Sequence, residues 1–378
     1  MKASPRGTRI VKRQQVAMDA YALIIAGGVG ARFWPRSREH SPKQLLEIIG
    51  SGTMIQNTVY RMDPIIPQER ILVITSAQQE EGVRKQLPQL PPENIIVEPF
   101  GRNTAPAIGL GAEILRKRAD DAVMVVLPAD HLVHDIAAFQ DTLKNAIAVA
   151  EQSRGFVTVG ITPTRPETGY GYIQFQKADE TRPYAEENAY EVVTFAEKPN
   201  LETAQRFLES GDFVWNSGMF IWRVSTILNG IAEHLPELSE ELGRLRGDID
   251  TDGFPAALES AYGEMRPISI DYGVMEKAEN RFVLPADFGW NDLGSWDEVA
   301  RLYPKDEQDS ASTGEVFLRD VRNCHVSTTE GRYAAVIGAE DLIVIDTADA
   351  VLVCRKGRSQ EVKEVVDHLR KKGLERFL

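Results

Sequence analysis

The stretch that decides the fold is Leu23-Ile24-Ile25-Ala26-Gly27-Gly28-Val29-Gly30-Ala31-Arg32, which is followed closely by Ser41-Pro42-Lys43-Gln44. An apolar strand runs directly into a glycine-rich loop, and two cations, Arg32 and Lys43, come after the strand. Glycines let backbone N–H groups approach an anion, and a following helix would add the positive end of its dipole. The stretch therefore predicts a strand–loop–helix unit that binds a nucleoside triphosphate.

Two common phosphate-binding patterns do not fit this loop. The P-loop needs Gly-Lys followed by Ser or Thr, whereas the chain reads Gly30-Ala31-Arg32-Phe33. The dinucleotide pattern needs a third glycine where Phe33 stands, which disfavours a dinucleotide-dependent oxidoreductase. A plain strand–turn–helix with surface cations is the simplest alternative, and a glycine loop alone would favour it. The two cations and the Pro42-Lys43 pair favour a phosphate site instead.

Composition limits the partners and the compartment. The chain has 378 residues, 43% of them hydrophobic, which is enough for one large domain and a small one. The formal net charge of −13 argues against a nucleic-acid or anionic-membrane partner. Cys324 and Cys354 are isolated and lack metal-site spacing, so we expect reduced thiols in a cytoplasmic protein. No apolar run is long enough to cross a membrane, and we expect residues 1–19 to be a disordered tail.

Short apolar runs alternate with helical stretches through the first half of the chain, which predicts an α/β, doubly wound, Rossmann-like domain over residues 20–304. The runs expected to form a buried parallel sheet are Ala22–Ala26, Ile71–Thr75, Ile95–Val97 and Val123–Leu127. The expected intervening helices are Gln56–Met62, Glu80–Leu87, Ala105–Lys117 and Ala137–Glu151. Further strands are expected at Val157–Gly160, Gly171–Gln176, Tyr190–Phe195 and Gly218–Trp222, with a helix at Leu201–Ser210.

Residues 305–378 change character and predict a small β-rich C-terminal domain. Short strands separated by turn residues are expected at Glu315–Leu318, Cys324–Thr328, Ala334–Ile337, Leu342–Asp346 and Ala350–Cys354. A helix over Gln360–Lys371 closes this part of the chain. The amino-acid sequence of this region shows no clear repeat of fixed period.

Asp130 is a candidate magnesium ligand. It follows the apolar run Val125–Leu127 in the segment Pro128-Ala129-Asp130-His131. Ligands of open α/β sheets sit at the carboxyl ends of the strands, and Mg²⁺ prefers carboxylate and phosphate oxygens. A helix N-cap or a solvated carboxylate is the ordinary alternative for one of 56 acidic residues. The position directly after a buried strand argues for the metal role, as does the resemblance of Pro128-Ala129-Asp130-His131 to a motif of sugar-1-phosphate nucleotidylyltransferases, and His131 is left as a neighbour without a role.

The sequence of the glycine-rich loop resembles the signature motif of the sugar-1-phosphate nucleotidylyltransferases. The similarity runs through Ala26-Gly27-Gly28-Val29-Gly30-Ala31-Arg32-Phe33-Trp34-Pro35, then Ser37-Arg38 and Pro42-Lys43-Gln44. The Trp-Pro-x-Ser-Arg motif is similar to that of mannose-1-phosphate guanylyltransferases. The resemblance extends over about residues 20 to 371. In that family the C-terminal domain is a short left-handed β-helix. The loop residues expected to bind nucleotide are Ala26, Gly27, Gly28 and Gly30.

The resemblance implies a second acidic motif and a turn that binds the base. Phe288–Asp297 matches the family's second metal-binding motif, with Asp292 as the Mg²⁺ ligand. A Trp-rich turn packed under the core is the plainer alternative, and we expect both, with Trp290 and Trp296 packing and Asp292 coordinating. The turn Glu98–Pro106 would face guanine and the triphosphate, since guanine offers donors and an acceptor. The residues expected there are Glu98, Arg102, Asn103 and Thr104, although Asn103 or Thr104 is also a plausible helix N-cap.

Three motifs resemble the sugar-phosphate half of the same family's site, and each alone could be a turn or a surface ion pair. They are Thr168–Ile173, Phe195–Pro199 and Trp215–Phe220. The expected contacts are Gly171, Tyr172, Glu197, Lys198 and Asn216. Asp271 also matches the family, without a role that the sequence assigns.

The family's reaction would be GTP plus mannose 1-phosphate giving GDP-mannose and pyrophosphate, with Mg²⁺ as cofactor. Arg32 would hold the β- and γ-phosphates and Lys43 the α-phosphate, so that catalysis is positioning and charge neutralisation. Another base or sugar is one alternative, and a non-catalytic module that binds nucleotide sugar is another. Some relatives carry a cupin-type isomerase domain for which this chain stops too early, so we expect no phosphomannose isomerase activity. The oligomeric state is not determined by the sequence, and a homodimer is compatible with it.

Overall fold

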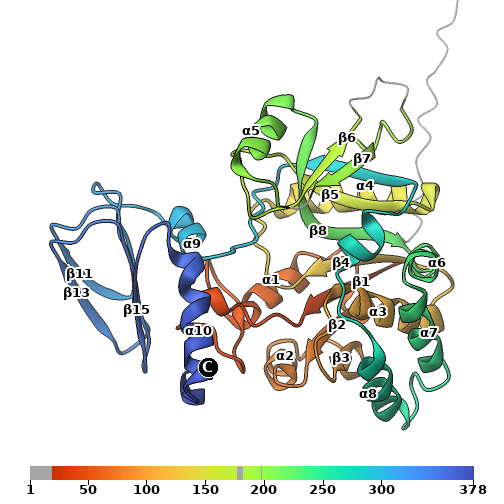
Figure 1. Ribbon diagram of the computed structural model, residues 1–378, viewed down its shortest axis with the longest axis horizontal. Coiled ribbons are helices and arrows are strands. Elements are labelled where there is room, and N and C mark those ends of the chain that lie inside the picture. The colour runs from red at the N-terminus through yellow and green to blue at the C-terminus, as the bar shows by residue number, and fades with distance from the viewer. Residues whose placement is uncertain (1–18, 177–181, 197) are drawn as a thin grey trace, which may run out of the picture.

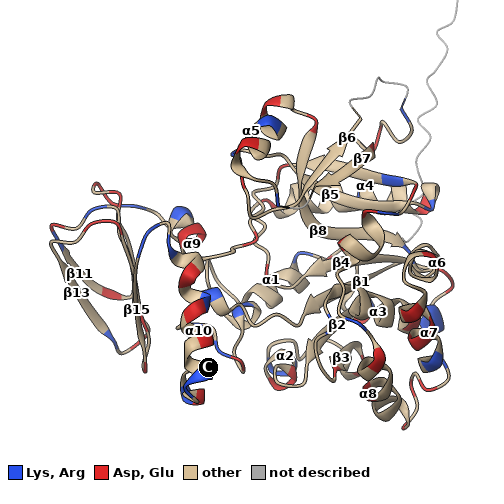
Figure 2. Cartoon of the chain, in the orientation of Figure 1, with Lys and Arg blue, Asp and Glu red and all other residues tan. Residues whose placement is uncertain are grey.

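The computed structural model describes residues 19–176, 182–196 and 198–378. A large α/β part occupies one side of the molecule, and a small group of C-terminal strands stands apart at the other end (Figure 1). Helices α9 (Trp296–Leu302) and α10 (Val362–Lys371) lie between the two parts. Charged residues lie mainly on the outer helices and loops, while the strands of the large sheet carry few of them (Figure 2).

A nine-stranded sheet forms the centre of the large part, in the order β3-β2-β1-β4-β8-β5-β9-β7-β6. The first four strands along this order are parallel: β1 (Ala20–Ala26), β2 (Ile71–Ser76), β3 (Ile95–Glu98) and β4 (Val123–Pro128). All four of these strands were expected from their apolar runs, and the structure confirms them with each extended by one or two residues. Their carboxyl ends therefore meet along one edge of the sheet.

Helices cover both faces of the parallel strands, which confirms the doubly wound architecture. Alternate residues of β1 separate the two faces, because Ala22 and Ile24 belong to one buried cluster and Leu23 to the other. One face packs on α1 (Met54–Tyr60), α2 (Glu80–Gln86) and α4 (Ile136–Ser153). The other face packs on α3 (Thr104–Arg118), α6 (Val224–His234), α7 (Pro236–Leu245) and α8 (Phe254–Glu264).

Strand β8 (Phe213–Arg223) joins the parallel strands to the second half of the sheet. Its C-terminal residues pair antiparallel with β4, whereas its N-terminal residues pair with β6 (Tyr172–Phe175). Its other edge pairs with β5 (Phe156–Ile161). Strands β9 (Arg281–Ala286) and β7 (Tyr190–Ala196) complete this group, and α5 (Leu201–Ser210) packs beside it. No element is predicted from the sequence between residues 223 and 304, where the structure has α6–α8, β9 and α9.

The C-terminal strands form two small sheets of mostly parallel pairs. The strands are β10 (Ala311–Thr313), β11 (Glu315–Arg319), β12 (His325–Ser327), β13 (Tyr333–Ile337), β14 (Leu342–Asp346) and β15 (Val351–Arg355). The pairs Glu315–Tyr333, Arg322–Glu340 and His325–Ile343 all join residues with the same separation along the chain. Equal separations mean that successive coils stack in register, as in a β-helix. The β-rich domain is thus confirmed, while its handedness and the boundary at residue 304 stay predictions.

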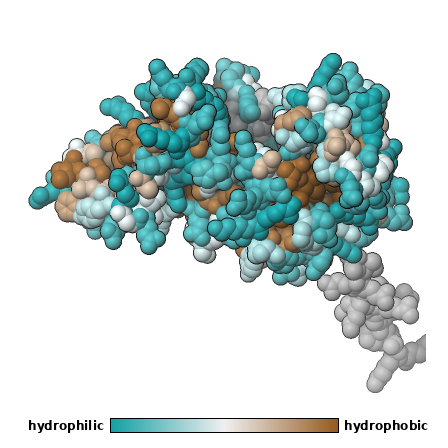
Figure 3. All heavy atoms as spheres, turned by 90° about the horizontal axis from the view of Figure 1, so that it is seen from below, coloured by the Kyte–Doolittle hydropathy of each residue, from teal (hydrophilic) through white to brown (hydrophobic). Residues whose placement is uncertain are grey.

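The outer faces of these coils carry apolar side chains. Tyr333, Ile337, Val351 and Val353 are among the exposed large hydrophobic residues, and apolar surface gathers at this end of the molecule (Figure 3). Cys324 is buried and Cys354 half-buried, and both are free thiols. Within the described ranges, no helix has the length and apolar character needed to span a bilayer.

Candidate active site

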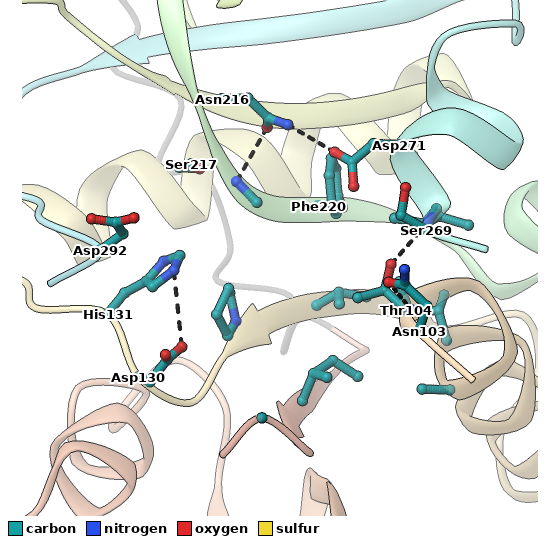
Figure 4. Close-up of a pocket in the computed structure, with 18 of the residues that line it drawn as sticks. Asn103, Thr104, Asp130, His131, Asn216, Ser217, Phe220, Ser269, Asp271 and Asp292 are labelled. Carbon is teal, nitrogen blue, oxygen red and sulfur yellow. Dashed lines mark hydrogen bonds and ion pairs between the residues drawn. The ribbon is translucent and has the colours of Figure 1, made fainter. Parts of the chain in front are cut away.

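A cavity of about 730 Å³ opens at the carboxyl ends of β1, β2, β3 and β4. In open α/β sheets this edge is where ligands bind. Asp130 and Asp292 lie toward one end of the cavity, and Asn103 and Thr104 at the start of α3 lie toward the other (Figure 4). The predicted site residues that line it are Gly27, Gly28, Glu98, Asn103, Thr104, Asp130, Gly171, Lys198, Asn216 and Asp292.

Buried amides hold the glycine loop in shape. Gln44 donates from Nε2 to the carbonyl oxygens of Ala26 at 3.1 Å and Gly28 at 2.9 Å, and also to Oε1 of Gln79 at 2.9 Å. Because these carbonyls are turned into the protein, the loop presents its N–H groups outward. Gly30 has a φ of +65°, and a Cβ at this position would lie 2.5 Å from Cβ of Lys43. Only glycine fits both the left-handed backbone and that close approach.

Lys43 joins the two predicted metal ligands. Its side chain is 5% exposed, and Nζ lies 2.9 Å from Oδ2 of Asp130. The same ammonium donates to the backbone carbonyl of Asp292. The sequence places these residues far apart, so the structure itself establishes their meeting. Burial alone would raise the pKa of Asp130, but the charge of Lys43, the contribution of His131 and the hydrogen bonds to the carboxylate together hold that pKa below its ordinary value.

Asp292 has a different environment from Asp130. Its Oδ1 accepts hydrogen bonds from the hydroxyl of Tyr170 at 2.7 Å and the N–H of Gly294 at 3.1 Å. Burial raises the pKa of Asp292, and the nearby charge of Asp130 adds to the rise. His131 stays neutral because burial lowers its pKa to about 4, and its Nδ1 accepts a hydrogen bond from the indole of Trp290. A cation between the two carboxylates would relieve their repulsion.

Arg32 lies in a smaller cavity beside the first. This cavity measures about 160 Å³ and shares Asp130, His131 and Asp292 with the larger one. Gly30 and Lys43 line it as well. Arg32 is exposed, so its guanidinium can reach a phosphate without losing a buried partner. The two predicted catalytic cations therefore both reach the acidic end of the site.

The end near α3 carries hydrogen-bonding groups suited to a base. Glu98 is 5% exposed, and its Oε1 accepts a hydrogen bond from the hydroxyl of Tyr262 at 2.9 Å. Burial raises the pKa of Glu98 to about 7, opposed in part by that hydrogen bond. Asn103 caps α3 by accepting from the N–H of Thr104, whose own hydroxyl accepts from the N–H of Ile270. The N-cap alternative is therefore realised, and both residues still line the cavity.

A polar pair lies above the cavity between its two ends (Figure 4). Asn216 donates from Nδ2 to Oδ1 of Asp271 at 2.8 Å, and its Oδ1 accepts from the N–H of Gly218 at 3.1 Å. Gly171 is close by, because its carbonyl accepts from the N–H of Asn216. Asp271 lines the cavity, so the residue that the sequence left without a role belongs to this wall.

Three predicted residues point away from the cavity. Arg102 donates to the carbonyls of Tyr262 and Gly263, and it does not line the cavity. Tyr172 is fully buried, with its hydroxyl donating to the carbonyl of Glu167. Ala26 contributes only its backbone, whose carbonyl accepts from Gln44 and Thr75. Glu197 lies outside the described residues.

Sequence reasoning missed Tyr170 and Ser76. Tyr170 stands in the quoted motif Thr168–Ile173, and it lines the cavity and bonds to Asp292. The hydroxyl of Ser76 is buried without a partner at the end of β2, where it also lines the cavity. Tyr170 is an aromatic residue of that motif, but it lies before β6 begins at Tyr172, so strand alternation does not place its side chain. Ser76 carries no signal beyond its place at a strand end.

Comparison with known proteins agrees with this geometry. Residues 21–309 match the family model described as nucleotidyl transferase. The chain belongs to the nucleotidyl transferase family. Residues 314–369 match a second model, described as the MannoseP isomerase/GMP-like beta-helix domain, which agrees with the stacked coils of the C-terminal strands.

Individual members of the nucleotidyl transferase family cover most of the chain. A mannose-1-phosphate guanylyltransferase of Klebsiella pneumoniae is 39% identical over 92% of this chain and 73% of its own. The xanthan biosynthesis protein XanB of Xanthomonas campestris is 40% identical over 94% of this chain and 74% of its own. A solved structure from Thermus thermophilus, described as a mannose-1-phosphate geranyltransferase, superposes with a TM-score of 0.82 at 36% identity, over 93% of this chain and 100% of that one.

Proposed function

We propose that this protein transfers a guanylyl group from GTP to mannose 1-phosphate, giving GDP-mannose and pyrophosphate. The observation that carries the proposal is the meeting of Lys43, Asp130 and Asp292 directly beside the glycine loop. This arrangement suits charge neutralisation at a phosphate, and relatives named mannose-1-phosphate guanylyltransferase match nearly the whole chain. The proposal extends their reaction to this chain.

The reaction needs no covalent enzyme intermediate. An oxygen of the sugar phosphate attacks the α-phosphorus of GTP in line, and the bond to the β-phosphate oxygen breaks, releasing pyrophosphate. A phosphate monoester is ionised at neutral pH, so the nucleophile needs no strong base. The residues of this chain therefore act by positioning and by electrostatic stabilisation.

Each cation has a separate part in this scheme. Lys43, held between Asp130 and the carbonyl of Asp292, would lie beside the α-phosphate, where negative charge develops. Arg32 would hold the leaving β- and γ-phosphates in the smaller cavity. Lys198 would hold the phosphate of the sugar in the larger cavity. Glu98 would accept the N1–H and N2–H groups of guanine, with Asn103 and Thr104 beside it.

The donor set fits a divalent cation, and we propose Mg²⁺. No group of three or more acidic, His or Cys residues that could hold a metal occurs in the described part of the chain. Asp130 and Asp292 each use one carboxylate oxygen for the bonds above, so the second oxygen of each could serve a cation. Triphosphate oxygens and water would complete the six ligands that Mg²⁺ prefers. When bound, the cation would screen the repulsion between the two phosphate substrates.

Pyrophosphate release tests this proposal. We expect release only when GTP and a sugar 1-phosphate are both present, with GDP-mannose as the second product by mass spectrometry. If dTTP or UTP with glucose 1-phosphate gave the fastest release, the protein would still be a nucleotidyl transferase, but the assignments of guanine and mannose would be wrong. Binding of a nucleotide sugar without any release would indicate a regulatory module. The cytoplasmic location and the homodimer stay predictions.

A further inference from the structure

The segment that follows the glycine loop does not face the substrates. Trp34 and Arg38 belong to the Trp-Pro-x-Ser-Arg motif, yet neither lines the large cavity or the small cavity that Arg32 lines. Trp34 is 8% exposed and Arg38 is 9% exposed. A buried guanidinium needs an ionic partner and a buried indole N–H needs an acceptor, so both side chains need polar partners outside the phosphate site.

Both side chains bond to the C-terminal part of the chain. The indole Nε1 of Trp34 donates to the carbonyl of Phe377 at 2.9 Å. Nη2 of Arg38 lies 2.8 Å from Oδ1 of Asp349, in the turn between β14 and β15. The guanidinium of Arg38 also lies 5.6 Å from the centre of the Trp34 ring, so the two contacts support each other.

The same contacts reach the turn that carries Asp292. Trp296 donates from Nε1 to the carbonyl of Trp34 at 3.1 Å, and its ring lies 5.1 Å from that of Phe33. Leu293, directly after Asp292, is fully buried in the same apolar cluster. That cluster also contains residues of β14, β15 and α10, namely Ile343, Ile345, Leu352, Val362, Val366 and Leu369. The loop after β1, the Asp292 turn and the C-terminal domain thus share one core.

We propose that Trp34 and Arg38 are positioning residues that fasten the phosphate-binding loop and the Asp292 turn to the C-terminal domain. The proposal rests on the proposed function for its catalytic consequence. Arg32 lies in a 3₁₀ helix of three residues, Ala31–Phe33, which is too short to hold itself in place. Its position is therefore set by what anchors the chain on either side. Gly30 is packed against Lys43 on one side, and Trp34 is held by Phe377 on the other.

Three variants test the proposal at different atoms. Trp34→Phe removes the indole donor and keeps an aromatic ring, deletion of residues 375–378 removes the acceptor, and Asp349→Asn removes the charge that pairs with Arg38. Asn323→Ala is the matched control in the same domain. Asn323 has a φ of +45° and bonds to Asp341 and Lys356, so its loss lowers stability without touching the loop.

We expect the KM for GTP to rise about threefold to tenfold in Trp34→Phe and in the deletion, with kcat reduced and the KM for the sugar phosphate unchanged, because one hydrogen bond is lost. Asp349→Asn should raise the KM for GTP by only about twofold to threefold, because Asp349 is 47% exposed and its ion pair with Arg38 is partly screened by water. Combining Trp34→Phe with the deletion should add little to the deletion alone, because the deletion already removes that bond together with the packing of Phe377 and Leu378. Asn323→Ala should lower the melting temperature and leave both KM values unchanged.

Hydrogen exchange provides a readout that does not depend on the reaction. We expect faster exchange of the amides of residues 28–38 in Trp34→Phe and in the deletion, and unchanged exchange there in Asn323→Ala. Unchanged exchange and GTP kinetics in the first two variants, with only a lower melting temperature, would overturn the positioning role. If the wild type released no pyrophosphate while the exchange still changed, the proposed function would fail and the fastening of the loop would stand.

Discussion

Replacing Lys43 by Met should slow catalysis far more than it weakens GTP binding. Met keeps the unbranched stem that packs against Gly30, where a Cβ would lie 2.5 Å from Cβ of Lys43, and it removes only the ammonium. That ammonium is buried and held between Asp130 and the carbonyl of Asp292. It therefore needs no reorganisation as charge develops on the α-phosphate.

The expected magnitude follows from this burial. Removing one preorganised electrostatic contact in a site shielded from water costs about 3–4 kcal/mol of transition-state stabilisation, a factor of about 10²–10³ in kcat. The ground-state triphosphate keeps Arg32 and the loop N–H groups, so the KM for GTP should change by less than about tenfold. The pKa of Asp130 should also rise, because the charge of Lys43 holds it below its ordinary value.

Steady-state pyrophosphate release at saturating sugar phosphate measures both constants. Lys117→Met is a matched control, because Lys117 is half-exposed and bonds to the carbonyl of Ile249 away from the cavity. We expect its kcat to equal that of the wild type. A Lys43→Met enzyme with near-normal kcat and a strongly raised KM for GTP would show that Lys43 only binds the nucleotide, and the reasoning above would be wrong.

Three further predictions concern the metal, the base and the loop. Asp130→Asn and Asp292→Asn should each retain the circular dichroism of the wild type and require far more Mg²⁺ for activity; an unchanged Mg²⁺ titration in both would contradict the metal site. Because burial raises the pKa of Glu98 to about 7, its carboxylate should form as the pH rises through 7, and the KM for GTP should fall between pH 6 and 8. This pH dependence should vanish in Glu98→Gln and move to higher pH in Tyr262→Phe, which lacks the hydrogen bond that lowers the pKa; identical profiles in all three proteins would remove Glu98 from base recognition. Gly30→Ala should lower stability by about 1–3 kcal/mol, measured by urea unfolding, because its φ of +65° is strained for any side chain.

Much of the fold could be predicted because its strands are short apolar runs buried on both faces. The pattern is clear in β1 and β4, where every residue between the ends is apolar. The stacked C-terminal coils were not visible as a repeat, because register rather than residue identity carries the period. Apolar pairs such as Leu318 with Val336 recur, but Glu315 pairs with Tyr333 and Arg319 with Ile337, so residue identity does not repeat from coil to coil.

Some positions of the candidate site could likewise be predicted from the sequence, and others could not. Asp130, Lys43 and the glycines could be placed because strand ends and glycine loops restrict where the backbone can go. Arg102 could not, because a long cation beside a turn can point either way, and here it bonds to the carbonyls of Tyr262 and Gly263. The partner of Trp34 was equally hidden, because the carbonyl of Phe377 is 343 positions away along the chain.

The central claim is guanylyl transfer to mannose 1-phosphate, and kcat/KM for four nucleotides crossed with three sugar phosphates tests it most directly. GTP, ATP, UTP and dTTP would each be paired with mannose, glucose and N-acetylglucosamine 1-phosphate. We expect GTP with mannose 1-phosphate to give the highest value, with other bases reduced by about 10⁴ because buried partners of guanine would be left unpaired. Glucose 1-phosphate with GTP should fall by about 10–10², since one hydroxyl changes orientation. A higher value for any other base, or for glucose 1-phosphate with GTP, would contradict the assignment.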